Sequence, residues 1–296
     1  MNEARQILAH QGLPDGDPAA APSSAKCFAD GKQWKIEIPS TEGPRALAVV
    51  IEEAARRRVP VDRISQGSGI MLLTDDEILE MVRLGEENRI EVNLFVGPRA
   101  TFDVGAQVFS PAGRTLGLSL RGADQLAFAM EDVLRAVRLG IRSILVSDIG
   151  NLMVMGNAKK RGDLPADLII KTSVMMAPCN PASARLLEDL GATTINIPSD
   201  LSIPQIAAIR SAIDAPIDFY VEAPDNIGGF LRYYEIPELI RVAAPIYLKF
   251  GLRNSPDIYP CGTHIENTAI ALTRERMRRA EMAMGFISRF CGPGPA

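Results

Sequence analysis

The chain alternates eight times between a short apolar run and a helical pattern, and this repeat limits the folds it can adopt. Most of the apolar runs contain two or more β-branched residues, and their continuous apolar character is typical of strands covered on both faces. A helical pattern follows every run but the fourth. The expected strands are 34–40, 61–67, 90–97, 142–148, 167–173, 193–199, 217–223 and 245–251.

Local signals mark where several of the expected helices begin. Thr74 with Glu77, and Ser202 with Gln205, have the spacing of a capping box. The helical patterns cover 44–58, 75–88, 123–140, 181–191, 203–213, 235–244 and 266–290. Most of the strand–helix units are about 25–29 residues long, as expected of a βα unit.

Eight such units predict an α/β protein with one closed (β/α)8 barrel of the TIM type. An open, doubly wound sheet is the alternative, but the first turn, "PSTEGP", lacks a glycine-rich phosphate loop. Residues 13–25 are rich in Pro, Ala and Asp, so we expect an N-terminal extension over 1–25 and the barrel over 26–296. A long insertion, 98–122, follows the third strand and is a candidate lid.

Composition excludes several classes of partner. The net charge is −4 with no block of one sign, which predicts neither a nucleic-acid nor a membrane partner. The chain contains no apolar run that would span a bilayer, and its first residues lack the pattern of a signal peptide, so we expect a cytoplasmic protein. Its four cysteines are scattered, which predicts reduced thiols, and two histidines are too few for a zinc site built mainly from imidazoles.

The active site of such a barrel lies at the carboxyl ends of its strands, where several polar residues are found. Glu222 ends the seventh expected strand, and Glu37 lies in the first. Strands one, seven and eight are neighbours in a closed barrel, so we expect both carboxylates at the mouth. There they would divide acid and base roles, bind a divalent cation, or balance the charge of nearby cations.

Two lysines and one histidine complete the candidate catalytic set. Lys171 and Lys249 lie inside apolar strands, where desolvation would lower the pKa of an amine and favour Schiff-base chemistry; charge pairing with the carboxylates is the alternative. His264 is expected in the first turn of the last helix, as a proton shuttle or as an exposed turn residue. The candidate substrate-binding residues are Arg253, Asn254, Ser68, Asp148, Asn196, Gly228 and Gly229.

The segment "LLEDLGATTINIPSDLSIPQIAAIRSAIDAPIDFYVEAPDNIGG" (186–229) resembles the collagenase-like U-type peptidases, family U thirty-two. The likeness rests on "LGA" at Leu190–Ala192, the helix start at Leu201–Ile206 and the strand that ends at Glu222. It implies a barrel and a hydrolase acting on amide bonds. In the family, cysteines shortly after this glutamate hold an iron–sulfur cluster in several members. This chain has none there, so we expect no such cluster.

The sequence therefore predicts a barrel enzyme acting on a small polar or anionic substrate, with amide hydrolysis as the first hypothesis. A lyase or aldolase that uses a barrel lysine or a divalent metal is the second, and a non-catalytic barrel that binds a ligand or partner is the third. The apolar, methionine-bearing last helix and the short N-terminal helical segment also predict a homo-oligomer, most simply a dimer.

Overall fold

The structure is a computed structural model that describes residues 2–97, 99 and 117–290. The expected insertion, 98–122, falls mostly on residues outside this range, so the candidate lid is not part of the described structure. Three of the four cysteines are described, and all three are free thiols: Cys27, Cys179 and Cys261.

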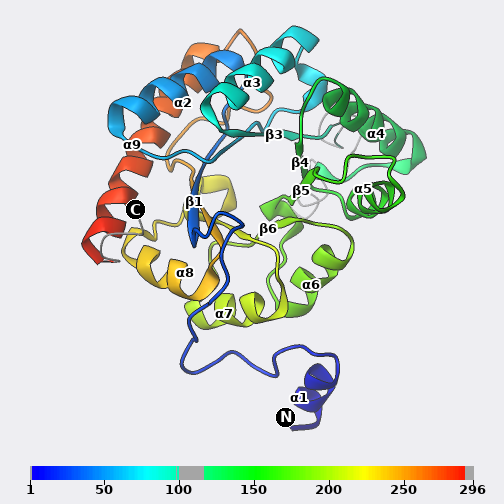
Figure 1. The fold of residues 1–296 in the computed structure, drawn as a ribbon, viewed down its shortest axis with the longest axis vertical. Coiled ribbons are helices and arrows are strands. Elements are labelled where there is room, and N and C mark those ends of the chain that lie inside the picture. The colour runs from blue at the N-terminus through cyan, green and yellow to red at the C-terminus, as the bar shows by residue number, and fades with distance from the viewer. Residues whose placement is uncertain (1, 98, 100–116, 291–296) are drawn as a thin grey trace.

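Eight parallel strands form one closed barrel in which each strand pairs with the next and β8 pairs with β1 (Figure 1). This confirms the predicted (β/α)8 fold, with every strand in the predicted order. The strands are shorter than the apolar runs because the runs include the turn residues that follow them. Their bounds are β1 Trp34–Pro39, β2 Arg63–Ser65, β3 Glu91–Phe95, β4 Ser143–Val146, β5 Ile169–Thr172, β6 Thr194–Asn196, β7 Ile217–Glu222 and β8 Ile246–Phe250.

A ring of helices surrounds the barrel (Figure 1). These are α2 Pro44–Arg57, α3 Asp75–Asn88, α4 Gly122–Arg138, α5 Ile149–Arg161, α6 Pro181–Asp189, α7 Ile203–Ala212, α8 Ile236–Ala243 and α9 Glu266–Phe290. Capping boxes open α3 at Thr74 and α7 at Ser202, as the sequence predicted. In the described part of the chain, no helix combines the length and apolarity needed to cross a membrane.

Helix α5 is the one barrel helix that the sequence pattern missed. Its apolar residues are mixed with two glycines and lie on more than one side, so "IGNLMVMGNAKKR" shows no clear apolar stripe. The second glycine, Gly156, explains part of this pattern, because α5 passes close to the loop after α6. A Cβ at Gly156 would lie 2.0 Å from the carbonyl oxygen of Leu190. Close packing of two backbones therefore replaces an aliphatic contact here.

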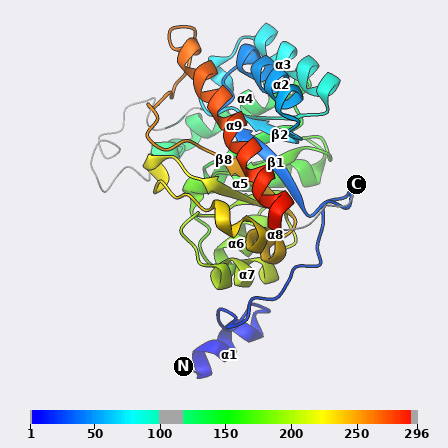
Figure 2. The same ribbon diagram turned by 90° about the vertical axis from the view of Figure 1, so that its left-hand side faces the viewer.

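The N-terminal residues start apart from the barrel and then run toward it (Figure 2). Helix α1 (Asn2–His10) stands apart from the ring of helices in both views (Figures 1 and 2). The following segment has no regular structure, but its last part is attached: Ser24 N donates to Arg241 O at 2.7 Å. Farther along, the ring of Phe28 meets Tyr247 edge to face at 4.9 Å and closes the amino-terminal end of the barrel.

Strand alternation separates two environments within the barrel. On β1, Ile36 and Ile38 are fully buried and belong to the apolar core between strands and helices. Glu37 lies between them in sequence and therefore points to the opposite face, into the barrel. The same alternation on the other strands places most of the charged strand residues inside.

Candidate active site

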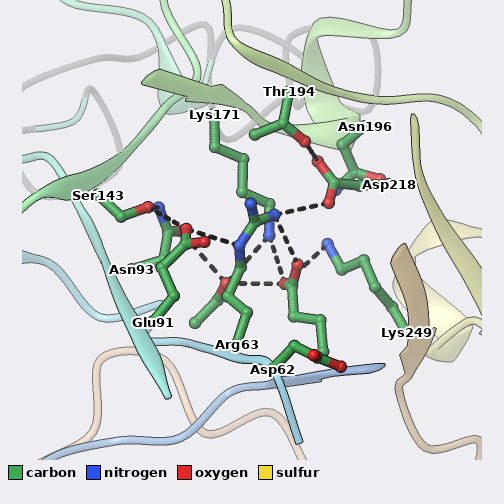
Figure 3. Close-up of polar contacts among 12 residues, drawn as sticks. Asp62, Arg63, Glu91, Asn93, Ser143, Lys171, Thr194, Asn196, Asp218 and Lys249 are labelled. Atoms are coloured by element: carbon green, nitrogen blue, oxygen red, sulfur yellow. Dashed lines mark hydrogen bonds and ion pairs between the residues drawn. The ribbon is translucent and has the colours of Figure 1, made fainter. Parts of the chain in front are cut away.

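Charged and hydroxyl-bearing side chains fill the interior of the barrel, where most barrels of this type have layers of aliphatic residues. We call this set the interior network (Figure 3). Three cations and three carboxylates within it balance in charge. Its members, all at most 4% exposed except Glu91, are Glu37, Arg63, Ser65, Glu91, Asn93, Ser143, Lys171, Thr194, Asn196, Asp218 and Lys249.

Lys171 on β5 and Glu37 on β1 are in direct contact. The Lys171 ammonium donates to Glu37 Oε1 and, at 3.0 Å, to Ser65 Oγ, and neither Lys171 nor Glu37 has exposed surface. Burial is the largest influence on the pKa of Lys171 and lowers it from 10.5 to about 7; Glu37 opposes this effect, and Lys249 adds to it. A substantial fraction of this amine is therefore uncharged and nucleophilic near neutral pH.

Glu37 is the anion around which the cations gather. Its carboxylate lies 3.3 Å from Arg63 Nη1 and 3.4 Å from Lys249 Nζ, and it accepts a hydrogen bond of 2.7 Å from Ser65 Oγ. Burial alone would raise the pKa of Glu37, but the cations, led by Lys171, outweigh it and hold the pKa well below its usual range. Glu37 therefore stays ionised and provides a fixed negative charge, not a general acid.

Arg63 connects the other two carboxylates of the interior network. It donates to Asp218 Oδ1 at 2.8 Å and to Glu91 Oε1 at 2.7 Å, and its guanidinium carbon lies 3.6 Å from the centre of the Tyr247 ring. Burial raises the pKa of Asp218, and Lys171 and Arg63 oppose this rise. Of the two fully buried carboxylates, Asp218 is therefore the better proton acceptor.

Lys249 is the member of the interior network that also contacts Tyr220. Its ammonium is 4.2 Å from the centre of the Tyr220 ring, on the strand next to its own. When the Asn196 amide is oriented to satisfy both neighbours, it accepts from Lys249 Nζ at 2.7 Å and donates to Asp218 O at 3.2 Å. The structure thus brings together Glu37, Lys171, Lys249 and Asn196, four of the predicted site residues.

Glu222 does not join this group, which corrects the expectation that it shares a ligand with Glu37. Strand alternation would place Glu222 inside with Tyr220, but the register of β7 against β8 shifts between these residues and pairs Glu222 with Phe250. The buried Glu222 carboxylate instead accepts from Tyr233 Oη at 2.7 Å and lies 3.5 Å from Arg279 of α9. It therefore lies between strand and helix.

Residues of the loop after β8, which the sequence predicts to bind a substrate, bond within the protein in this structure. Arg253 directs its guanidinium to Asp225 Oδ1, at 3.0 Å from Nε, and Asn254 N donates to the same carboxylate. Gly228 and Gly229 have positive φ values of 105° and 65°. A Cβ at Gly229 would come within 2.8 Å of Arg253 Nε, so the glycine pair makes room for this ion pair.

The remaining predicted residues lie apart from the interior network. Ser68 Oγ accepts from Cys261 N at 2.7 Å and joins two loops at the mouth. Asp148 caps α5 by accepting from Asn151 N at 2.8 Å, and it lines a cavity of ≈ 320 Å³ beside β4 and β5. His264 is exposed in the turn before α9, not within the helix as expected.

The proposed metal ligands, Glu37 and Glu222, point to opposite sides of the sheet. Across residues 2–97, 99 and 117–290, no three His, Cys, Asp or Glu side chains are grouped as metal ligands would be.

Several members of the interior network escaped the sequence reasoning. Arg63 and Asp218 lie near the starts of their apolar runs and were not predicted, because the prediction concentrated on polar residues nearer the carboxyl ends; Tyr220, which packs on Lys249, was not predicted either. A sequence pattern could have revealed them: a polar residue lies two positions before another polar residue, as with Arg63 and Ser65. This spacing places both on one face of a strand.

The fold and the interior network together define a (β/α)8 barrel with a charged lysine–carboxylate centre. Residues 119–223, which run from just before α4 to just after β7 and include Lys171, match Peptidase family U32. This confirms the resemblance seen in the sequence and extends it toward the N-terminus. No curated protein matches the chain significantly.

Two of the solved structures similar to this chain support the fold. The YdjI aldolase from Escherichia coli K12 has a TM-score of 0.53 at 14% identity, covering 87% of this chain and 93% of its own. A Rubisco-like protein from Rhodopseudomonas palustris has a TM-score of 0.51 at 12% identity, covering 92% and 67%. The U32 peptidase Mk0906 is 16% identical, with a TM-score of 0.45 and coverage of 78% and 97%.

Proposed function

We propose that the protein is a barrel enzyme that forms an imine between Lys171 and the carbonyl group of a small substrate, and that it acts as a lyase. The observation that carries the proposal is the environment of Lys171: a fully buried amine with a pKa of about 7, in contact with an ionised carboxylate. An amine with an ordinary pKa of 10.5 would be almost entirely protonated at neutral pH.

The chemistry of this step balances within the interior network. The uncharged Lys171 amine attacks the carbonyl carbon, and one proton passes from the nitrogen to the carbonyl oxygen. The proton that the ammonium released on becoming uncharged is then added to the same oxygen, which leaves as water as the protonated imine forms. The protonated imine carries the same single positive charge as the ammonium it replaces. Glu37 therefore stabilises both forms, and the charge balance of the interior is kept. The imine then accepts the electron pair of a bond next to the former carbonyl carbon, which is the bond a lyase breaks.

The position of Lys171 is consistent with access from the carboxyl end of the barrel. Lys171 is the last residue but one of β5, and Lys249 holds the same place in β8. Tyr220, two residues beyond Asp218 on β7, is partly exposed and packs on Lys249. We expect a substrate to displace Tyr220 in order to reach the amine.

Hydrolysis of an amide bond in a small polar or anionic substrate is the second candidate. It is supported by the match of residues 119–223 to Peptidase family U32. The charged interior supports the imine-forming reaction more directly. That reaction needs a nucleophilic amine, as at Lys171, and a negative charge that stabilises the protonated imine, as at Glu37.

Reductive trapping tests the proposal. The full chain would be incubated separately with pyruvate, glyceraldehyde and dihydroxyacetone phosphate, reduced with borohydride and analysed by intact mass and peptide mapping. We expect one adduct per chain at Lys171, absent from Lys171→Met and Lys171→Arg. The adduct should persist in Lys160→Met, which changes an exposed lysine of α5.

An adduct that survives in both Lys171 variants would overturn the proposal, and so would the absence of adducts with all three probes. In the second case, release of new amino groups from a peptide mixture would favour the hydrolase. Binding without turnover would favour the non-catalytic barrel.

A further inference from the structure

Arg276 of α9 is buried at the mouth of the barrel without a carboxylate partner. Only 4% of the residue is exposed, and its Nη1 donates to Ser40 O, just after β1, at 3.3 Å. Its Nε has no hydrogen-bond partner, and no acidic side chain of the described residues lies within ion-pair distance. A buried, unpaired guanidinium is costly, which indicates that an anion completes the site.

Arg63, another buried arginine, shows how carboxylates compensate a buried guanidinium in this protein. Arg63 has three carboxylates, at 2.7, 2.8 and 3.3 Å. Arg276 has none of these, and burial is the main cause that lowers its pKa. The guanidinium of Arg276 is therefore the less compensated of the two charges.

The groups around Arg276 are neutral hydroxyls and one carboxylate engaged elsewhere. Ser40 Oγ and the phenol of Tyr259 are in hydrogen-bond contact, and Tyr220 and Tyr259 are close enough to Arg276 to influence it electrostatically. Glu42 is the nearby acid, but its two oxygens accept from Gly67 N at 2.6 Å and Ser68 N at 3.1 Å. Glu42 is therefore committed to the loop after β2.

We propose that Arg276, with the hydroxyl groups of Tyr259 and Ser40, binds the carboxylate of a monoanionic substrate at the barrel mouth. One guanidinium and two hydroxyls suit a carboxylate, which accepts bidentate hydrogen bonds from arginine. Tyr220 connects the two regions, because its ring packs on Lys249 and its phenol acts electrostatically on Arg276. If the imine proposal for Lys171 holds, the substrate class is a 2-oxo acid; the carboxylate site itself does not depend on it.

Binding measured by NMR titration separates the two proposals. Pyruvate and acetate are the carboxylate probes, and methyl pyruvate is the uncharged control. We expect both carboxylates to bind the wild type, and Arg276→Gln to weaken their affinity at least tenfold. Lys171→Met should bind acetate within threefold of the wild type. Arg278→Gln, an exposed arginine on the same helix, is the matched control and should also behave as the wild type.

Arg276→Lys keeps the charge but loses the planar fork, and it replaces Arg276→Gln if the latter does not fold. It should weaken acetate binding about fivefold or more. Wild-type affinity in both Arg276 variants would overturn the proposal, as would failure of the wild type to bind either carboxylate. Tighter binding of inorganic phosphate than of acetate would overturn the assignment of a carboxylate. An effect of Lys171→Met alone would concern only the imine proposal.

Discussion

The ammonium of Lys171 bonds the carboxylate of Glu37 directly across the barrel, because β5 and β1 are four strands apart in either direction around the closed sheet. The contact therefore ties opposite sides of the barrel through its interior. Neighbouring strands contribute Ser65 and Lys249 to the same carboxylate. Replacing buried ion pairs by well-packed aliphatic side chains is often neutral or stabilising, so packing stability alone does not account for these charges.

Removing Glu37 should destabilise the protein more than removing Lys171. Glu37→Gln leaves Lys171, Lys249 and Arg63 around a neutral amide, and breaking a buried pair in this way costs roughly 3–5 kcal/mol. Lys171→Met removes a cation that is already partly uncharged at neutral pH, so we expect a smaller loss. Urea unfolding of both variants measures the two free energies.

A surface carboxylate provides the control for this comparison. Glu80→Gln removes an exposed ion pair with Arg83, which should change the free energy of unfolding by less than about 1 kcal/mol. The double variant Glu37→Gln/Lys171→Met should recover part of the loss caused by Glu37→Gln alone. Equal losses in the two single variants would contradict the assignment of Lys171 as partly neutral.

The lowered pKa of Lys171 predicts how stability depends on pH. Between its folded pKa of about 7 and its ordinary value of 10.5, the folded protein binds fewer protons at this site than the unfolded chain. The free energy of unfolding should therefore rise with pH in this window. As pH falls toward 7, the cost of burying this amine should grow and the protein should become less stable. Lys171→Met lacks the site, so its stability should rise less between pH 7 and 9.5. Denaturation curves at several pH values test this, and parallel profiles would refute it.

Replacing Glu222 should affect packing and not turnover. Its carboxylate accepts from Tyr233 Oη and Arg253 N, at 2.7 and 3.1 Å, and pairs with Arg279. Glu222→Gln should cost about 1–3 kcal/mol, since one buried acceptor is lost. Imine trapping at Lys171 should be unchanged. A loss of trapping with intact folding would instead place Glu222 in the reaction.

The sequence predicted the barrel because every strand and most helices carry a local signal of their own. It also predicted Glu37, Lys171 and Lys249 as site residues, since a charge inside an apolar run is visible in one dimension. It could not predict where Glu222 points, because the shift in register after Tyr220 depends on pairing with β8. The contact between Glu37 of β1 and Lys171 of β5, which are far apart in the sequence, likewise follows only from closure of the sheet.

Trimming the N-terminus should show where the extension begins to support the barrel. Removal of residues 1–12 takes away α1, which stands apart, and should leave the melting temperature nearly unchanged. Removal of residues 1–25 also takes away the hydrogen bonds of Ala21 and Ser24 to Arg241. This should lower the melting temperature by several degrees, which corresponds to about 1 kcal/mol in the free energy of unfolding. Scanning calorimetry compares the three chains. Identical melting temperatures would show that these bonds contribute nothing.

Two helical glycines provide a matched test of how closely α5 approaches the loop after α6. A Cβ at Gly156 would lie 2.0 Å from Leu190 O and 3.2 Å from the Cα of Gly191, and both contacts are with backbone. Gly156→Ala therefore requires α5 to move away from α6 and should cost more than about 2 kcal/mol.

Gly285 of α9 is exposed, and a Cβ there would meet no atom within 4 Å. Gly285→Ala should stabilise the helix by about 0.5–1 kcal/mol, because alanine loses less backbone entropy than glycine. In chemical denaturation, the midpoint should therefore fall for Gly156→Ala and rise for Gly285→Ala, relative to the wild type. A stabilising Gly156→Ala would mean that α5 does not pack against this loop as described.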